Sequence, residues 1–489
     1  MNGHLFANFA TMKTNLMTSL QILLLILGTA LGCAAQPQGM KYEPVCYEDG
    51  TSISGERDVE AILKKDRLQC DTTVNASGDT LITVRHTSAF LRMQLEGLPA
   101  DAGIDHILLV PMKGEPKEIP VTVPESGKVV VWMTRAPGKL PATAAIATAK
   151  DGRMWSARLK KNAIKAGTAY RWNAAFVTPD APAPGISARV RPSVPLPDIE
   201  SGEYSGITWL SGDSYAVVDN EQKGGGILHF TIAIDGTGDV DKVSMRPAQG
   251  TVTSTVTRRD GEGIAYAPSL GTLYVASERH QEILEYDLAG RETGKALKVP
   301  DDLSVKAITG NRGFEALTFN DSTGLFWTTT EAPLPKDTFL PRIIRLQSFC
   351  TNGKPSERFL YQIGAPEKSS ADASAYVFGV PCMAALDDGR VLVLEREVYV
   401  PKGNLLDKIQ KAFTRMDLYV VDPVHDTAGI LRKSLVCSFR TGALDLANFE
   451  GMCLGPTLPD GRRCLVLIAD SQKGAGGLTQ EYVKVILLK

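Results

Sequence analysis

Three glutamates open short apolar segments in similar phrases: 260-DGEGIAYAP-268 with Glu262, 313-GFEALTFN-320 with Glu315, and 448-NFEGMCLGP-456 with Glu450. A buried carboxylate is costly unless a partner compensates its charge. Several carboxylates brought together favour binding of a divalent cation, and oxygen ligands suit Ca²⁺ better than Mg²⁺ or Mn²⁺. The three phrases therefore raise the hypothesis of a calcium site.

A second carboxylate follows at a fixed distance. Glu278 and Glu331 each lie 16 residues after a leading glutamate (278−262 and 331−315), and Asp470 follows Glu450. In an antiparallel pair, the start of one strand and the end of the next lie side by side. With Asp219 and Glu395, which lack a leading partner, eight carboxylates are expected at one end of the fold. The predicted metal ligands are Glu262, Glu278, Glu315, Glu331, Glu450 and Asp470.

Cations follow the second carboxylates or precede a leading one. They are Lys223, Arg279 with His280, Lys336, Arg396, Lys473 and, before Glu315, Arg312. In a functional interpretation, Glu262, Glu315, Glu450 and His280 are catalytic, and Arg279, Arg312, Arg396 and Lys473 bind an anionic substrate such as a phosphate ester. In a structural interpretation, the same cations form ion pairs between neighbouring units.

The elements that carry these residues repeat. Five units each contain two apolar strands joined by a Gly or Asp turn, with first strands beginning at 206, 263, 316, 383 and 451. Further strands follow each pair, so residues 200–489 are predicted to form a β-propeller of four-stranded blades. The count gives five blades, and the two longest spacings leave room for a sixth. The last unit lacks one strand, which the segment 187-SARVRPS-193 is expected to supply.

The rest of the chain is divided by composition. Residues 46–176 alternate apolar and polar residues between Gly, Pro and Asp, which predicts a β-sandwich. A Pro-rich segment, 177–199, links it to the propeller, so the whole fold is expected to be all-β. In the fourth unit, 403-GNLLDKIQKAF-413 has a helical apolar pattern, and its apolar face is expected to pack on the propeller rather than bind a membrane.

The N-terminal 33 residues are typical of an export signal: one Lys, an apolar run, then small residues before Cys33. The ending 30-ALGC-33 is similar to a bacterial lipobox, which predicts lipidation of Cys33 and a membrane anchor, with residues 34–45 as a tether. The protein is expected in the cell envelope, either periplasmic or at the surface. The seven remaining cysteines have no zinc spacing and are expected to be mainly free thiols.

Charge excludes one class of partner. The chain has 53 Lys and Arg against 55 Asp and Glu, and no dense basic run. The electrostatic footprint of nucleic-acid binding is therefore missing.

The propeller half resembles the family called esterase-like activity of phytase, or phytase-like. The phrases that carry the resemblance are 205-SGITWL-210, 260-DGEGIAYAP-268, 311-NRGFEALTF-319, 394-LERE-397 and 448-NFEGMCL-454. The resemblance implies an esterase or phosphoesterase, aided by calcium. Glu262, Glu315 and Glu450 match the family phrases. The other two units lack the leading glutamate and have Ser205 and Cys382 at that position. Residues 88–112 and 165–176 of the first domain resemble fimbrillin-like domains.

Two functions remain open from the sequence. The first is a metal-assisted phosphoesterase that acts on a small anionic ester: Glu262, Glu315 and Glu450 hold calcium, water attacks phosphorus, and Arg or Lys stabilises the anion. The second is a non-catalytic propeller that binds a glycan, a peptide or an envelope protein. No GxSxG motif occurs in the chain, which argues against an α/β-hydrolase esterase.

Overall fold

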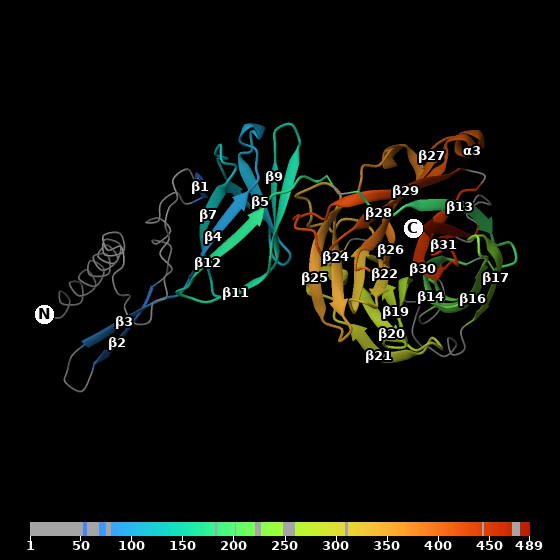
Figure 1. Ribbon diagram of the computed structural model, residues 1–489, viewed down its shortest axis with the longest axis horizontal. Helices are drawn as coiled ribbons and strands as arrows, with labels where there is room; N and C mark the ends of the chain where they lie inside the picture. Colours follow the sequence, from blue (N-terminus) through green and yellow to red (C-terminus); the bar gives the residue numbers. More distant parts are fainter. Residues whose placement is uncertain are drawn as a thin grey trace.

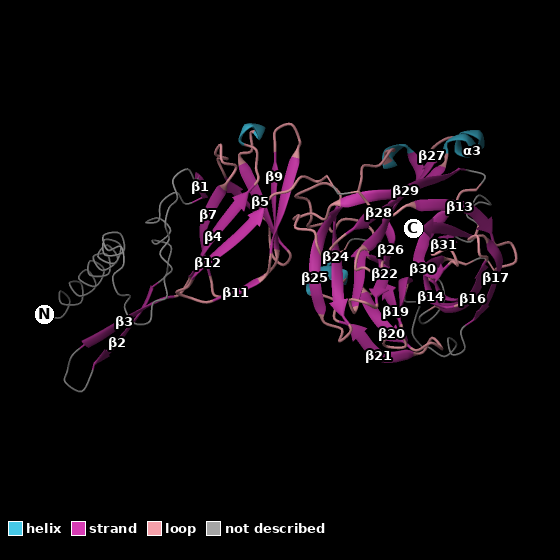
Figure 2. Cartoon of the chain, viewed as in Figure 1, coloured by secondary structure: helices cyan, strands magenta, loops and turns pink. Residues whose placement is uncertain are grey.

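The computed structural model describes residues 52–55, 68–74, 80–180, 183–200, 202–220, 226–247, 260–308, 312–442, 445–471 and 480–489, with side chains described from Thr87 onward. The expected signal, Cys33, Lys223 and Lys473 lie outside these residues. Figure 1 shows a smaller β domain beside a larger ring of sheets, and Figure 2 shows that strands dominate both. Within the described ranges, no helix is long and apolar enough to cross a membrane.

The first domain contains two four-stranded sheets. One has the order β1 (Ser52–Gly55), β7 (Val129–Arg135), β4 (Ala89–Glu96), β12 (Ala169–Ala175); the other has the order β10 (Met154–Leu159), β9 (Thr143–Thr148), β5 (His106–Pro111), β6 (Lys117–Pro120). Two two-stranded antiparallel sheets accompany them: the hairpin of β2 (Leu68–Val74) and β3 (Thr80–His86), and the pair β8 (Gly138–Leu140) and β11 (Asn162–Ile164).

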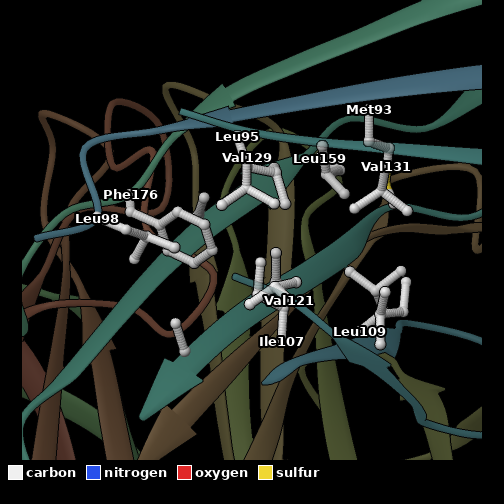
Figure 3. Packing of buried hydrophobic residues seen from close by; sticks show 14 of the residues in the cluster. Met93, Leu95, Leu98, Ile107, Leu109, Val121, Val129, Val131, Leu159 and Phe176 are labelled. Atoms are coloured by element: carbon white, nitrogen blue, oxygen red, sulfur yellow. The ribbon is translucent and has the colours of Figure 1, made fainter. Parts of the chain in front are cut away.

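Alternating residues of the two sheets form the core of this domain. Met93 of β4 and Val131 of β7 lie on one side, and Ile107 and Leu109 of β5 lie on the other, all buried (Figure 3). Because successive side chains of a strand point to opposite faces, every second residue is available for such a core. The predicted β-sandwich is confirmed; its likeness to fimbrillin domains stays a prediction.

Five four-stranded sheets form the second domain. They are β14 (Tyr204–Ser211), β15 (Ser214–Asp219), β16 (Ile227–Ile234), β17 (Val240–Pro247); β18 (Gly261–Ala267), β19 (Thr272–Ser277), β20 (Glu282–Tyr286), β21 (Glu292–Leu297); β22 (Phe314–Asn320), β23 (Leu325–Thr330), β24 (Ile343–Cys350), β25 (Pro355–Gln362); β26 (Ala373–Ala385), β27 (Val391–Pro401), β28 (Phe413–Val421), β29 (Lys433–Gly442); and β30 (Asn448–Thr457), β31 (Arg463–Asp470), β32 (Tyr482–Leu488), β13 (Ala188–Pro195).

The sheets are the blades of a propeller. The first strands of the blades contact one another in a cycle, β14 with β18, β18 with β22, β22 with β26, β26 with β30, and β30 with β14. The last blade takes its fourth strand from β13, which pairs antiparallel with β32 and joins the start of the propeller to its end. The predicted five-bladed propeller is confirmed for the described residues.

Glycines in the repeated phrases let the first strands approach closely. A Cβ added to Gly206 would lie 2.2 Å from the carbonyl oxygen of Glu262, and one added to Gly263 would lie 2.5 Å from the backbone nitrogen of Leu317. Neither distance is compatible with a side chain unless a strand moves. The glycine that follows the leading position in these two blades therefore has a packing role at the centre of the ring.

Gly206→Ala is expected to lower the free energy of unfolding by about 1–3 kcal/mol, because its methyl group would push β14 away from β18. Gly236→Ala is the matched control, since a Cβ there meets nothing within 4 Å, and its effect is expected to stay within about 0.5 kcal/mol. Urea unfolding of both variants measures the difference. Equal stabilities would contradict the packing role of Gly206.

The two domains share an apolar contact. Val110, Ala144 and Ile146 of the sandwich pack with Ile343 and Leu360 of the third blade. Polar groups reinforce this contact: Arg358 is buried, donates to the carbonyl oxygen of Met112 at 2.9 Å and forms an ion pair with Asp302. The sandwich is therefore fixed against the outer side of the propeller, as Figure 1 shows beside β24 and β25.

The helix predicted within 403–413 is present as α3 (Leu405–Lys411), capped by the side chain of Asn404. Its apolar face does not pack as expected. Leu405, Leu406 and Ile409 are exposed, and only Phe413 beyond the helix is buried. The expected packing of this face on the propeller is therefore wrong.

The cysteines with described side chains are all free thiols: Cys350, Cys382, Cys437, Cys453 and Cys464.

Candidate functional site

Three carboxylates of the second blade lie together. Glu262 is on β18, Asp260 directly precedes that strand, and Glu278 follows β19. One oxygen of each residue lies within 4.8 Å of the others, and all three residues are buried. The antiparallel pairing of Gly261 with Ser277 places their neighbours Glu262 and Glu278 at the same end of the blade. This separation is suited to a shared cation.

The backbone around these three residues is strained. Asp260 has a φ of 56° and Gln281 a φ of 50°, which is the left-handed region that side chains disfavour. Both residues are buried, and the Gln281 side chain donates to the carbonyl oxygen of Glu278 at 2.8 Å. Strain of this kind persists where surrounding contacts impose it and is frequent at functional sites.

Glu278 has one satisfied and one unsatisfied oxygen. The backbone N–H of Gly313 donates to Oε1 at 2.8 Å, whereas Oε2 is buried and has no hydrogen-bond partner among the described residues. Burial raises the pKa of Glu278 to about 7 despite the bond from Gly313, and the charges of Glu331, Asp260 and Glu450 contribute to the rise. An orphaned, buried carboxylate oxygen is the kind of atom that a cation would satisfy.

The acidic cluster extends to neighbouring blades, and we use this name for Asp260, Glu262, Glu278, Glu315, Glu331 and Glu450. Burial, followed by the charges of Glu450, Glu278 and Asp260, raises the pKa of Glu262 well above its usual value. Burial and the charges of Glu262 and Glu331 do the same for Glu315. The shifts arise because like charges share a desolvated space.

Arg396 of the fourth blade compensates one side of the acidic cluster. Its buried guanidinium forms ion pairs with Glu331 and Glu450 and donates to Oδ1 of Asn448 at 2.9 Å. Burial disfavours the charged arginine, but the pull of Glu450 and Glu331 is stronger, and the pKa of Arg396 is raised. Burial also raises the pKa of Glu331, although Arg396 opposes the rise. Arg396 thus joins three blades by ion pairs, as the structural interpretation of the cations expects.

The fourth blade contributes this cation in place of a carboxylate. Glu395 was expected beside the other acids, but its carboxylate accepts hydrogen bonds from Tyr361, the backbone N–H of Gly364 and Lys433. The β26–β27 pair has a register shift between Gly379 and Cys382, close to the position where Arg396 takes the place of Glu395. The expectation that Glu395 joins the cluster is therefore wrong. Asp470 is buried opposite Asn448 on the paired strand, and Asp219 is buried opposite Tyr204.

The other predicted cations differ in their surroundings. Arg279 is exposed, with Nε 3.8 Å from Oδ2 of Asp260. Arg312 is also exposed, and its charge opposes the rise that burial causes in the pKa of Glu331. Lys336 contacts Asp302 instead of the cluster. His280 is exposed, with Nδ1 3.4 Å from the Ser277 hydroxyl. Arg279 and Arg312 are thus the cations beside the cluster that also reach solvent among the described residues.

Beneath the cluster the propeller is almost closed. A cavity of only about 10 Å³ lies between the first strands, lined by Ser205, Glu315, Cys382, Glu450 and the apolar residues and glycines that follow the leading positions. This volume is close to that of a single water probe. Among the described residues, the space between these first strands is therefore too small for a ligand larger than water. We call the end of the propeller where β18, β22 and β30 begin the carboxylate end.

Several polar neighbours were not predicted as site residues. Asp260 completes the carboxylate trio, Asn220 donates from Nδ2 to Glu262 at 3.2 Å, and Asn448 bonds both Arg396 and Glu450. Asp260 and Asn448 each stand two residues before a leading glutamate. That spacing was a usable signal, whereas the contact of Asn220 crosses from the first blade to the second and leaves no local pattern.

Solved structures similar to this chain share little sequence with it. A hydrazine synthase of Kuenenia stuttgartiensis is 12% identical over 55% of this chain and 56% of its own, with a TM-score of 0.26. A β-propeller domain of Myceliophteria thermophila is 10% identical over 61% and 99%, with a TM-score of 0.29. A duf4221 family member of Bacteroides vulgatus is 7% identical over 62% and 98%, with a TM-score of 0.33. The chain thus spans little more than half of the first of these proteins, and no functional conclusion rests on likenesses this weak.

No curated protein matches the chain. One family model matches residues 199–472, which are more than half of the 489 residues and include the acidic cluster and Arg396. The family is described as phytase-like, esterase-like activity of phytase, and the match confirms the resemblance seen in the repeated glutamate phrases. This chain belongs to the phytase-like family.

Proposed function

We propose that this protein is an exported envelope lipoprotein whose propeller is a calcium-assisted phosphoesterase. The observation that carries the proposal is the trio of Asp260, Glu262 and Glu278, buried together with an oxygen of Glu278 that has no hydrogen-bond partner in the described part of the chain. Family membership supports an ester as the substrate class. The chemistry of the trio supports a hard divalent cation.

The donor set fits such an ion. All three groups of the trio are carboxylates, and within the described ranges the six carboxylates of the acidic cluster face one fully buried cation, Arg396. Glu262, Glu278 and Asp260 would hold calcium, with Glu315 adjacent. A bound calcium ion would neutralise charge on a phosphoryl oxygen and so help to stabilise the transition state.

The two exposed arginines would bind the substrate anion. Arg279 adjoins the trio through Asp260, and Arg312 precedes Gly313, whose N–H binds Glu278. An arginine can donate two parallel hydrogen bonds to phosphate oxygens. Arg396 is already paired with Glu331 and Glu450, so we assign it to positioning those carboxylates rather than to substrate. His280 would act as the general acid or base of the hydrolysis. Lys473, which lies outside the described residues, remains a candidate for binding the substrate anion.

The expected activity is hydrolysis of phytate or p-nitrophenyl phosphate that requires calcium and is lost in EDTA. Glu278→Gln is expected to lower kcat/KM at least roughly tenfold, because a neutral amide binds calcium more weakly than a carboxylate. Thermal unfolding recorded in the same buffers separates a loss of activity from a loss of fold.

Glu395→Gln is the matched control for this substitution. Glu395 is also a buried glutamate of the second strand of a blade, β27, but it bonds to Tyr361 and Lys433, outside the cluster. Its replacement is expected to leave the calcium response intact. A calcium-raised melting temperature without turnover in the unchanged protein would contradict the enzyme and favour a non-catalytic propeller.

Export and lipidation of Cys33 belong to the same proposal and rest on the sequence of the N-terminus. Cys33→Ala is expected to release the protein from the membrane fraction into the soluble fraction.

A further inference from the structure

The exposed face of α3 is an unusual concentration of apolar side chains. Leu405 is 64% exposed, Leu406 61% and Ile409 41%. Five other large apolar residues are exposed in the described part of the chain, at positions 270, 288, 305, 424 and 435, and they lie on five separate segments. Single exposed apolar residues need no explanation, whereas adjacent ones indicate a contact surface.

Basic residues flank this apolar face. Residues 402–411 contain Lys402, Lys408 and Lys411 against one acid, Asp407, which gives a net charge of +2 (3 − 1). Lys411 pairs with Asp407 at 2.8 Å but keeps 61% of its side chain exposed. Leucine and isoleucine surrounded by lysine are typical of segments that lie at the surface of an anionic bilayer.

The support beneath α3 holds this face outward. Phe413 and Tyr399 are buried under the helix with ring centroids 5.6 Å apart, and the guanidinium of Arg440 lies 3.8 Å from the Phe413 ring centre. The Asn404 cap fixes the first turn. The helix contacts β27 and β29 but leaves its leucines uncovered. The apolar face is thus presented by a packed support.

The helix also projects from the carboxylate end of the propeller. Gly379 lies against the backbone of Glu331 and marks the level of the acidic cluster. The paired segments 373–378 of β26 and 397–401 of β27 continue past that level, and α3 follows directly (Figure 1). The helix is thus carried on an extension of the fourth blade beyond the acidic cluster.

We propose that the segment Lys402–Lys411 docks on an anionic lipid bilayer. Leu405, Leu406 and Ile409 enter the boundary between headgroups and acyl chains, and the lysines contact the anionic headgroups. Charge complementarity selects the bilayer as the occupant, and the interaction is independent of catalysis at the acidic cluster.

The test is hydrogen–deuterium exchange of the full chain, with vesicles containing phosphatidylglycerol, with phosphatidylcholine vesicles, and without vesicles. Peptides covering 403–412 are expected to exchange several-fold more slowly with phosphatidylglycerol vesicles alone. Because exchange is read peptide by peptide, binding through the apolar N-terminus does not produce this signal. The double variant Leu405→Glu with Leu406→Glu is expected to lose the protection, since glutamates neither enter the bilayer nor attract anionic headgroups.

Val424→Glu is the control, because Val424 is 56% exposed at a turn of the same blade, and it is expected to keep the protection. Absence of protection at 403–412 would overturn the proposal. Equal protection by both kinds of vesicle would also overturn it, since the lysines would then have no role. Protection that rises with protein concentration without vesicles would identify a second copy of the chain as the occupant instead.

Discussion

Replacing Arg396 by alanine is expected to lower the free energy of unfolding by about 3–5 kcal/mol at pH 7. The guanidinium is buried between three blades and is the partner of both Glu331 and Glu450. Its removal leaves two carboxylates in a desolvated space that already contains other acids. The cost is therefore that of unpaired buried charge, which is larger than the net value of the ion pairs. Urea unfolding in EDTA measures it without a contribution from metal.

Two further variants make this result specific. Arg153→Ala removes an exposed arginine that pairs with Asp151, and the expected cost is below about 1 kcal/mol. Adding Glu331→Gln to Arg396→Ala is expected to restore part of the lost stability, because one unpaired charge disappears. If Arg396→Ala costs no more than Arg153→Ala, the guanidinium does not hold the carboxylate end together.

The fold was predictable because its repeat is visible in the chain. Each blade supplies apolar strands that recur along the chain, and in the second, third and fifth blades the leading glutamates mark the same end of the propeller. Glu262 and Glu278 lie close together, as their spacing predicts, because antiparallel pairing brings the start of one strand beside the end of the next.

The fourth blade was less predictable because its contacts depend on register. Glu395 and Arg396 are adjacent in the sequence, and successive residues of a strand point to opposite faces. Which of them reaches the cluster is decided by the irregular pairing near Gly379 and by Lys433 on a distant strand. Local pattern contains neither piece of information.

In the repeated phrases, residues needed for function and residues needed for packing are adjacent, and the sequence alone does not distinguish them. Glu262 indicates a cation-binding site. Gly263 next to it is needed for packing, because β18 and β22 approach too closely for a side chain. The face of α3 is the opposite case. Its apolar spacing predicted a helix correctly, but spacing alone does not say whether the apolar face meets protein or another surface.

Without calcium, the stability of the protein is expected to fall as the pH rises from 5 to 8. The pKa of Glu278 is about 7 in the folded protein against an ordinary value of 4.5, so the folded state binds the proton more tightly than the unfolded chain. Stability from such a group is complete below the unfolded pKa and is lost as the pH rises through the folded pKa. For Glu278 alone the loss is about 2–3 kcal/mol, and Glu262 and Glu315, whose pKa values are also raised, act in the same direction.

Calcium is expected to oppose this loss, because the ion competes with protons for the same oxygens. Its stabilisation should therefore be small at pH 5 and large at pH 8, reaching about 2.7 kcal/mol when free calcium is 100 times its dissociation constant. Urea unfolding across this pH range, with calcium or EDTA, measures both effects. Glu278→Gln should make the EDTA profile less steep, since glutamine does not titrate while Glu262 and Glu315 remain, whereas Glu395→Gln should leave the slope unchanged. Stability that rises between pH 5 and 8 in EDTA would show that Glu278 is ionised and compensated within the protein, and the need for a cation at the acidic cluster would disappear.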